Sequence, residues 1–99
     1  MHRRFAKWAE QKRRGLDALG VNTEEICLAE DGTKPSARVD HSSSCCMGRV
    51  TVWESGEMVA EVLELRSGET FLVIHHDLTC EADFDAASRA YFAALASGR

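Results

Sequence analysis

The sequence predicts an α+β two-layer sandwich, in which N- and C-terminal helices cover one face of an antiparallel meander sheet of four or five strands. Segment 48–77 contains three alternating apolar stretches joined by two short Ser-Gly turns, which is typical of consecutive hairpins. Apolar residues recur at helical spacing near both ends of the chain. With 99 residues, the chain is expected to form a single domain over 1–99 with one core.

The opening helix is expected over residues 3–19. An apolar stripe at three- and four-residue spacing supports it, and the stripe consists of Phe5, Trp8, Ala9, Leu16, Leu19 and the stem of Lys12. Gly20 follows directly and is suited to end the helix. Because Trp8 lies on this stripe, we expect it in the core rather than on a ligand-binding surface.

Two strands are expected before the meander. Residues 24–30 are assigned to the first, although Glu and Ala are weak strand formers. Residues 31–35 form a turn by composition, and apolar and polar side chains then alternate over 36–40. Residues 41–46 are a polar run of His, Ser and Cys, which we expect to form a loop or a poorly ordered hairpin tip.

The strands of the meander are expected at about 48–54, 57–65 and 70–76. Val50 and Val52 share one face of the first strand, and Trp53 lies on the other. The middle strand is apolar on both parities, which either a bulge or a sheet apolar on both sides would explain. The last strand is also apolar on both parities, so we expect it to be central or covered on both faces.

The closing helix is expected over 83–96. Asp83 is suited to be its N-cap, and Asp85 lies in the first turn, where the helix dipole favours an acid. The apolar stripe of this helix consists of Phe84, Ala87, Tyr91 and Leu95, broadened by Phe92 and Ala94.

The net charge of −4 is unevenly distributed along the chain. Residues 1–14 hold six basic side chains and one acidic side chain, whereas the rest hold six basic and 15 acidic side chains, a net charge of −9. One interpretation is that these charges are solvated faces and favourable helix ends. The other is that the acidic body steers the protein toward a basic partner.

Compartment and redox state follow from the absence of export features. No apolar run of about 18 residues or more is present, and no apolar segment follows the basic start of the chain. We therefore expect a cytoplasmic protein with reduced thiols. Cys27 and Cys80 are expected as small apolar fillers, and Cys45-Cys46 as loop residues.

The adjacent pairs Cys45-Cys46 and His75-His76 are the first candidates for metal ligands. Neighbouring residues on a strand point to opposite faces, so neither pair is suited to chelate one ion. No other spacing typical of metal ligands occurs in the sequence. We expect no metal and no cofactor.

Catalysis and nucleic-acid binding find little support. His75-His76-Asp77 at a strand end is the best local catalytic candidate, but no Ser or Cys lies in a strained elbow or Gly-rich context. A strand-end histidine held by neighbouring backbone or acid is the simpler interpretation. Single glycines in turns form no phosphate loop, and an acidic sheet opposes a phosphate backbone. We expect neither an enzyme nor a partner that is a nucleic acid or a membrane.

Binding of another protein is the remaining hypothesis. A row of glutamates flanks a tryptophan, which gives an acidic patch with an aromatic anchor of the kind enriched at protein interfaces. A solvated outer face is an equally good interpretation of the same row. The candidate partner-binding residues are Trp53, Glu54, Glu57, Glu61, Glu64, Glu69, His75 and His76.

A family resemblance spans nearly the whole chain. Its motifs are Phe5-x-x-Trp8-x-Glu10, Leu19-Gly20, a lone Pro35, the block GRVTVWESGEMVAEVLEL-x-SGE-x-x-x-x-x-HH from Gly48, and Asp83-Phe84-Asp85 with Tyr91-Phe92. Together they resemble the TriTu family of bacterial immunity proteins. Loop 41–46 and the strongly basic first helix depart from the pattern, so no individual contact residues are carried over.

The resemblance implies a specific function. Members of this family neutralise TreTu-type toxins, which are ADP-ribosyltransferases that are delivered by type VI secretion, often on Rhs carriers, and modify elongation factor Tu. The resemblance implies a non-enzymatic protein that binds the toxin domain and occludes its active site, as a monomer in a 1:1 heterodimer. Two alternatives stay open: a chaperone or adaptor for a secreted effector, and a small metal-binding or enzymatic domain built on the histidines and a cysteine.

Overall fold

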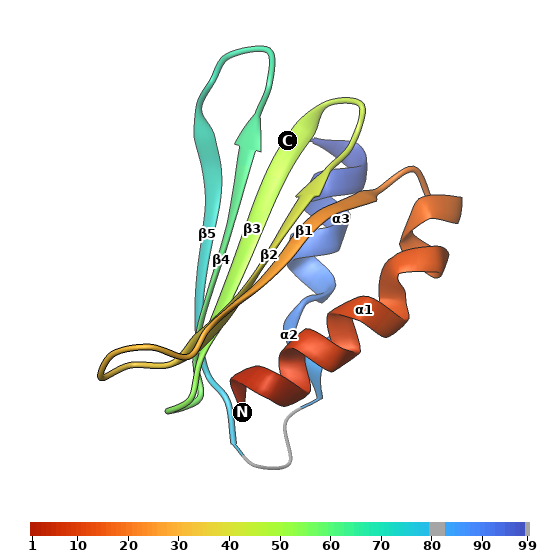
Figure 1. Cartoon of the computed structure of the whole chain (residues 1–99). Helices are drawn as coiled ribbons and strands as arrows, with labels where there is room; N and C mark the ends of the chain where they lie inside the picture. The colour runs from red at the N-terminus through yellow and green to blue at the C-terminus, as the bar shows by residue number, and fades with distance from the viewer. Residues whose placement is uncertain (80–82, 99) are drawn as a thin grey trace.

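Five antiparallel strands form one sheet, and the helices pack on the same face of it (Figure 1). The computed structural model describes residues 1–79 and 83–98, and the structural statements below concern these residues. The strands lie in the sheet in chain order, so the predicted α+β two-layer sandwich is confirmed. The elements are α1 (His2–Ala18), β1 (Asn22–Ala29), β2 (Ser36–Ser42), β3 (Cys46–Trp53), β4 (Glu57–Glu64), β5 (Thr70–Asp77), α2 (Phe84–Ala87) and α3 (Arg89–Ser97).

The end of α1 is set by Gly20. Its φ of 81° is a left-handed conformation that a residue without Cβ adopts easily. Its N–H donates to the carbonyl of Asp17 at 3.0 Å, so the predicted helix stop is confirmed. The prediction that Leu19 belongs to the core is wrong, because its side chain is 75% exposed. Leu19 lies in the turn itself, where the chain no longer follows helical periodicity.

A hairpin joins β2 to β3, and its tip covers residues 43–45, which is shorter than the loop or hairpin tip that was expected over 41–46. The first two residues of this segment belong to β2 and the last belongs to β3, so that prediction is wrong for them. Ser43 organises the short turn: its hydroxyl donates to the carbonyl of Leu95 at 2.6 Å and accepts from the Cys46 N–H at 3.1 Å. The bond to Leu95 ties the turn to α3, a long-range contact that the polar composition of the segment does not reveal.

The position of β5 also differs from the prediction. β5 pairs with β4 and lies at the edge of the sheet, so the expectation of a central strand or one covered on both faces is wrong. Leu72 and Ile74 pair with core residues of β4, whereas Val73 has the other parity and is 54% exposed. The register between β4 and β5 shifts at Val62/Leu63, which agrees with the bulge considered for the middle strand.

The closing segment forms two helices instead of one. Ser88 separates α2 from α3 with φ −99° and ψ 0°, which leaves the α-helical region and ends α2. Asp83 caps α2 as predicted, since its carboxylate accepts from the Ala86 N–H at 3.2 Å. Asp85 lies in the first turn, also as predicted. Within the described residues, none of the helices has the length and apolar character needed to cross a bilayer.

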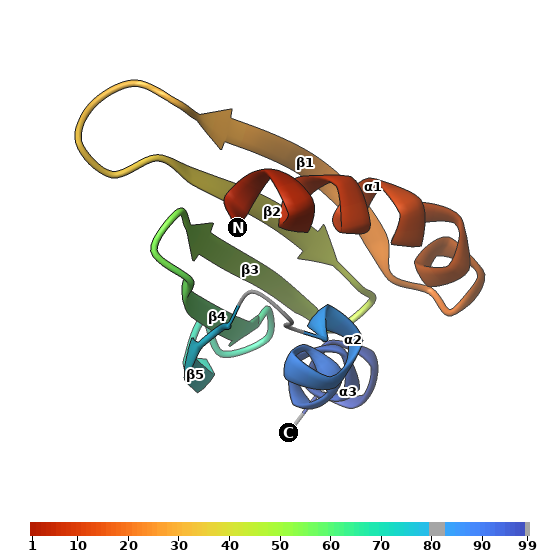
Figure 2. The same ribbon diagram turned by 90° about the horizontal axis from the view of Figure 1, so that it is seen from below.

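The core fills the space between the sheet and the helices. α1 packs on β1 and β2, and α3 packs on β3 and β4 (Figure 2). Trp8 packs against this core, with its ring centroid 5.6 Å from that of Phe5, which confirms its predicted place. The fully buried apolar residues of the strands are Ala37, Val39, Cys46, Val50, Val52, Met58, Ala60 and Val62.

Candidate functional site

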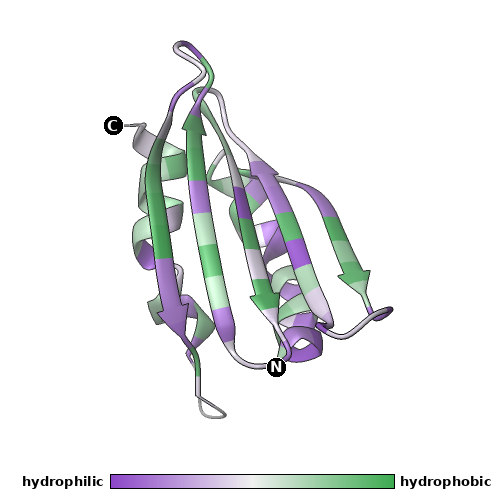
Figure 3. Ribbon diagram, turned by 90° about the vertical axis from the view of Figure 1, so that its left-hand side faces the viewer, coloured by the Kyte–Doolittle hydropathy of each residue, from purple (hydrophilic) through white to green (hydrophobic). Residues whose placement is uncertain are grey.

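The face of the sheet opposite the helices is the candidate site, and we call it the open face (Figure 3). Alternate residues of each strand point to it, because side chains in a strand alternate between the two faces. The strand register aligns these residues in rows across the sheet. One row runs Glu25, Asp40, Arg49, Glu61 and Val73, and the next runs Cys27, Arg38, Thr51, Val59 and His75.

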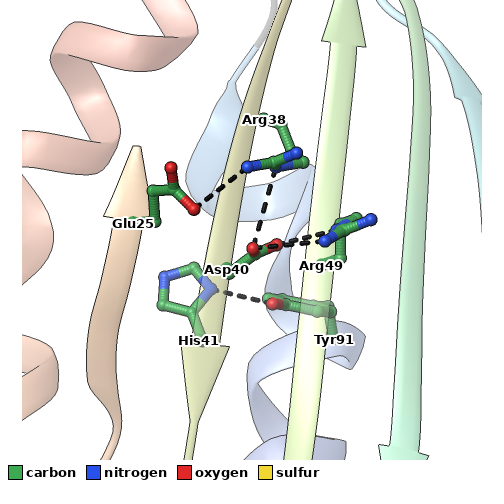
Figure 4. A network of polar contacts seen from close by, with 6 residues as sticks. All are labelled: Glu25, Arg38, Asp40, His41, Arg49 and Tyr91. Atoms are coloured by element: carbon green, nitrogen blue, oxygen red, sulfur yellow. Dashed lines mark hydrogen bonds and ion pairs between the residues drawn. The ribbon is translucent and has the colours of Figure 1, made fainter. Parts of the chain in front are cut away.

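A network of ion pairs crosses the first three strands of the open face (Figure 4). Arg49 donates from Nε to Oδ1 of Asp40 at 2.8 Å and from Nη2 to Oδ2 at 3.3 Å. Arg38 donates to Glu25 at 3.1 Å, and its Nε lies 3.7 Å from Oδ2 of Asp40. Asp40 is thus held between two guanidinium groups, with its side chain 19% exposed. The bond to Asp40 raises the pKa of Arg49, so this guanidinium stays charged at neutral pH.

A second polar pair lies on the covered face and has a structural role. Nδ1 of His41 lies 2.8 Å from the hydroxyl of Tyr91, and both residues are almost fully buried. Burial lowers the pKa of His41 to about 4 and raises that of Tyr91 well above its usual range. The imidazole is therefore neutral at pH 7. The hydrogen bond of this buried pair joins α3 to β2.

Two shallow hollows lie on the open face and at its end. The first, which we call the central hollow, has a volume of about 250 Å³ and is lined by Asp40, Met47, Gly48, Arg49, Glu61, Leu63 and Thr70. The second, the end hollow, has a volume of about 300 Å³ and is lined by Trp53, Glu57, Met58, Val59, His75, His76 and Asp77. Small-molecule sites usually measure roughly 300–1,000 Å³. The central hollow is smaller than this range and the end hollow lies at its lower limit, so both are small for a metabolite and of a size that suits single side chains of a partner.

The predicted partner-binding residues are divided between several places. Trp53, Glu57 and Glu61 lie on the open face, together with His75 of the adjacent edge strand. His76 has the opposite parity, where it pairs with Met58, yet it is exposed and lines the end hollow.

The remaining glutamates lie at the two ends of the sheet. Glu54 follows β3 in the turn to β4, whereas Glu64 and Glu69 flank the turn at the far end of β4. The hydroxyl of Ser67 donates to Glu64 at 2.8 Å within that turn. The structure therefore places Glu57 and Glu61 on the same face as Trp53 and the other glutamates at the ends of the sheet.

Lys34 modifies the electrostatics of the end hollow. Its ammonium lies 2.8 Å from the carboxylate of Glu57 and 5.1 Å from the centroid of the Trp53 ring. The hydrogen bond from Lys34 lowers the pKa of Glu57, so this carboxylate is charged and already paired. The ammonium of Lys34 therefore lies over the Trp53 ring and covers part of it.

Sequence reasoning missed the central hollow. Asp40, Met47 and Arg49 come from two strands, and they meet Glu61 through the register of β3 with its neighbours. The alternation over residues 36–40 shows which of them are polar, but it does not show which residues of the next strand lie opposite them. The signal that could have found the site is a pair of opposite charges on the polar parity of two adjacent strands, Asp40 on β2 and Arg49 on β3.

The cysteines form no candidate metal centre in the part of the chain that the structure describes, where no group of His, Cys, Asp and Glu is placed to hold an ion. Cys46 is buried in β3, so its assignment to a loop is wrong, and burial raises the pKa of its thiol. Cys27 is half-buried on the open face, not in the core as expected of a filler. Cys80 lies outside the described residues.

Comparison with known families identifies the chain. A sequence model of the family described as immunity protein TriTu matches residues 3–94. No curated protein matches the sequence. The matched span runs from α1 into α3 and includes every strand. The chain therefore belongs to the TriTu family of immunity proteins, whose function is immunity and whose partner is a toxin.

Proposed function

We propose that this immunity protein neutralises an ADP-ribosyltransferase toxin that modifies elongation factor Tu and is delivered by type VI secretion on an Rhs carrier. It acts in the cytoplasm of the producing cell, where it binds the toxin domain as a 1:1 complex and covers the NAD-binding active site. The family resemblance supports this class of toxin. The contact surface is the open face, and it performs no chemistry of its own.

One observation carries the choice of surface: in the described part of the chain, no helix covers the open face. The face combines exposed apolar side chains with charged ones, a mixture that occurs at the interfaces of protein complexes. Val73 is 54% exposed and Met47 is 44% exposed, on the same side of the sheet as the ion-pair network.

The size of the molecule supports the use of a whole face. A stable complex buries roughly 800 Å² on each partner. The chain exposes 5880 Å² in total, so such an interface covers about one seventh of its surface. Neither hollow is large enough to supply this area alone, which makes the face as a whole the contact surface.

The charge distribution supports a basic partner. The basic helix α1 packs on the covered face, so its cations lie behind the sheet, while Glu57 and Glu61 lie in front. Acids at the rim of an interface increase the association rate with a positively charged partner. Trp53 supplies a large apolar contact of the kind that slows dissociation.

The test is toxin neutralisation by a variant of the open face. In Trp53→Ala/Glu57→Lys, we expect lower affinity for the toxin domain and less protection of cells that co-express the toxin. Purified toxin is mixed with excess immunity protein, and NAD consumption is measured with elongation factor Tu as acceptor. The wild-type chain is expected to stop NAD consumption, and the variant to stop it incompletely.

The matched control is Asp17→Lys, which makes the same change of charge on an exposed residue of α1. It is expected to protect cells like the wild type. Full protection by the open-face variant would show that another surface binds the toxin. NAD consumption that continues in the presence of excess wild-type chain, despite binding, would indicate a chaperone or adaptor instead of an inhibitor.

A further inference from the structure

We propose that the central hollow is a socket for one arginine side chain of the toxin, and that Glu61 is the carboxylate that receives its guanidinium. This inference rests on the proposed function and adds the chemistry of a specific contact. Three features of the hollow carry it: its charge balance, its apolar walls and its size.

The charge balance leaves one carboxylate available. Asp40 already accepts two hydrogen bonds from Arg49 and lies 3.7 Å from Nε of Arg38. Glu61 pairs with Arg49 across the strands and contributes to the field that raises the pKa of Arg49. Within residues 1–79 and 83–98, however, Glu61 makes no hydrogen bond or ion pair. A bound cation would complete the charge balance of the hollow.

The walls of the hollow suit the stem of a long side chain. Met47 and Leu63 are paired neighbours on β3 and β4 and line one side of the hollow. Val73 of β5 does not line the hollow, but it pairs with Glu61 and is exposed, so it adds apolar surface next to it. Arginine buries its methylene groups along apolar surface and keeps its charged end at a polar group. Apolar walls beside a carboxylate match both parts of this side chain.

The floor of the hollow is fixed from below. Gly48 lines the hollow with its backbone, and the ring of Tyr91 lies against Gly48 on the covered face. A Cβ at this position would lie 2.5 Å from the Tyr91 hydroxyl, so the ring leaves no space for the floor to sink. The socket is thus preformed, which lowers the entropic cost of binding.

Other occupants fit the hollow less well. An anion would approach the carboxylates of Asp40 and Glu61 while the guanidinium of Arg49 is already engaged. A purely apolar side chain would leave Glu61 desolvated without a partner, which is costly. Arginine is preferred over lysine because its planar fork can donate two bonds to one carboxylate.

The test is the dissociation rate of the complex with the toxin domain. Glu61→Gln keeps the size of the side chain and removes its charge. We expect Kd to rise roughly 10- to 100-fold, mainly through faster dissociation, because a charged partner is then buried without its counterion. Surface plasmon resonance at low and high salt separates this effect from rim electrostatics, which act mainly on the association rate.

Asp17→Asn is the control, since it removes one exposed carboxylate from α1 and is expected to leave both rate constants unchanged. A charge swap then identifies the partner. Arginines of the toxin domain are replaced in turn by Glu and combined with Glu61→Arg, and one combination is expected to restore slow dissociation.

The outcomes separate this inference from the proposed function. If Glu61→Gln dissociates like the wild type while Trp53→Ala/Glu57→Lys binds weakly, the socket is wrong and the open face remains the interface. If both variants bind like the wild type, the open face itself is the wrong surface. If no toxin arginine rescues Glu61→Arg, the occupant of the hollow is not an arginine.

Discussion

Each face of the sheet holds a polar pair with the same hydrogen-bond distance, but the two pairs differ in their contribution to stability. On the covered face, Nδ1 of His41 lies 2.8 Å from the Tyr91 hydroxyl, and on the open face, Nε of Arg49 lies 2.8 Å from Asp40. The first pair is almost fully buried, whereas the side chain of Arg49 is 52% exposed. Breaking a buried pair leaves polar atoms without water, while an exposed pair is replaced by hydration.

The comparison shows how one strand can serve two purposes. Successive residues of β2 alternate between a core position and a surface charge, as Val39, Asp40 and His41 illustrate. Stability is concentrated on the covered face, so substitutions on the open face are expected to change binding more than folding. The following predictions test this division, from the largest expected effect on stability to the smallest.

Removal of the Tyr91 ring should have the largest effect. Tyr91→Ala deletes a fully buried aromatic side chain and leaves His41 without its partner. We expect a loss of about 4 kcal/mol in the free energy of unfolding, measured by urea denaturation followed by circular dichroism. Tyr91→Phe, the control, keeps the ring and should lose about 1 kcal/mol. Equal losses in the two variants would mean that packing of the ring contributes little.

Acid should weaken the covered face through His41. Burial is the main cause of its pKa of about 4, the charge of Asp40 opposes this shift and that of Arg13 adds to it. Because the folded-state pKa lies below the unfolded-state value of about 6.5, the unfolded chain binds the proton first as pH falls. Stability is complete above about pH 6.5 and should decrease by roughly 3 kcal/mol by pH 4.

The measurement is the urea midpoint as a function of pH. His41→Gln removes the titrating group while keeping a hydrogen-bonding side chain, so its profile over the same range should be flatter. If the variant loses stability with acid as steeply as the wild type, other groups, such as paired carboxylates, control the profile.

A methyl group added at Gly48 should destabilise the fold, because it would point from the strand toward the covered face. In Gly48→Ala the added Cβ meets the Tyr91 hydroxyl at 2.5 Å, and the buried ring has to move. We expect a loss of about 2 kcal/mol, which is within the usual range for overpacking. The double variant with Tyr91→Ala should be less destabilised than the sum of the two, because the clash disappears with the ring. If the losses of the two single variants add up in the double variant, the clash with the Tyr91 ring is not the cause of the destabilisation by Gly48→Ala.

Loss of the exposed pair should have the smallest effect on stability. Arg49→Gln removes the bond to Asp40 on the open face, where water can replace it. We expect a change of about 0.5 kcal/mol or less in the free energy of unfolding by urea denaturation. The same variant should alter toxin affinity more strongly, since Arg49 borders the central hollow. A loss above about 2 kcal/mol in the free energy of unfolding would show that the ion-pair network contributes strongly to stability.

Much of the architecture is predictable from the sequence because it depends on local patterns. Helical spacing located α1, alternation and Ser-Gly turns located β3 to β5, and Asp83 marked the start of α2. The errors arise where distant contacts decide. The hydroxyl of Ser43 binds α3 and orders the hairpin turn, and β5 lies at the edge although its composition is that of a buried strand.

The candidate site was only partly predictable for the same reason. Trp53, Glu57 and Glu61 share a parity along β3 and β4, which alternation shows directly. Glu64 has the parity of Val62 and the core, so including it in one row with Glu61 ignored the pleat. Asp40 and Arg49 escaped notice because their meeting depends on the register of β2 and β3.

The chain order of the strands has a consequence for how quickly protection becomes available. Every strand pairs with its neighbour in sequence, so each hairpin closes a short loop, and such local topologies fold fast. We expect the sheet to assemble progressively as the nascent chain leaves the ribosome, with α3 docking last against β3 and β4. A newly made molecule would then be ready to bind within a fraction of the time needed for its synthesis.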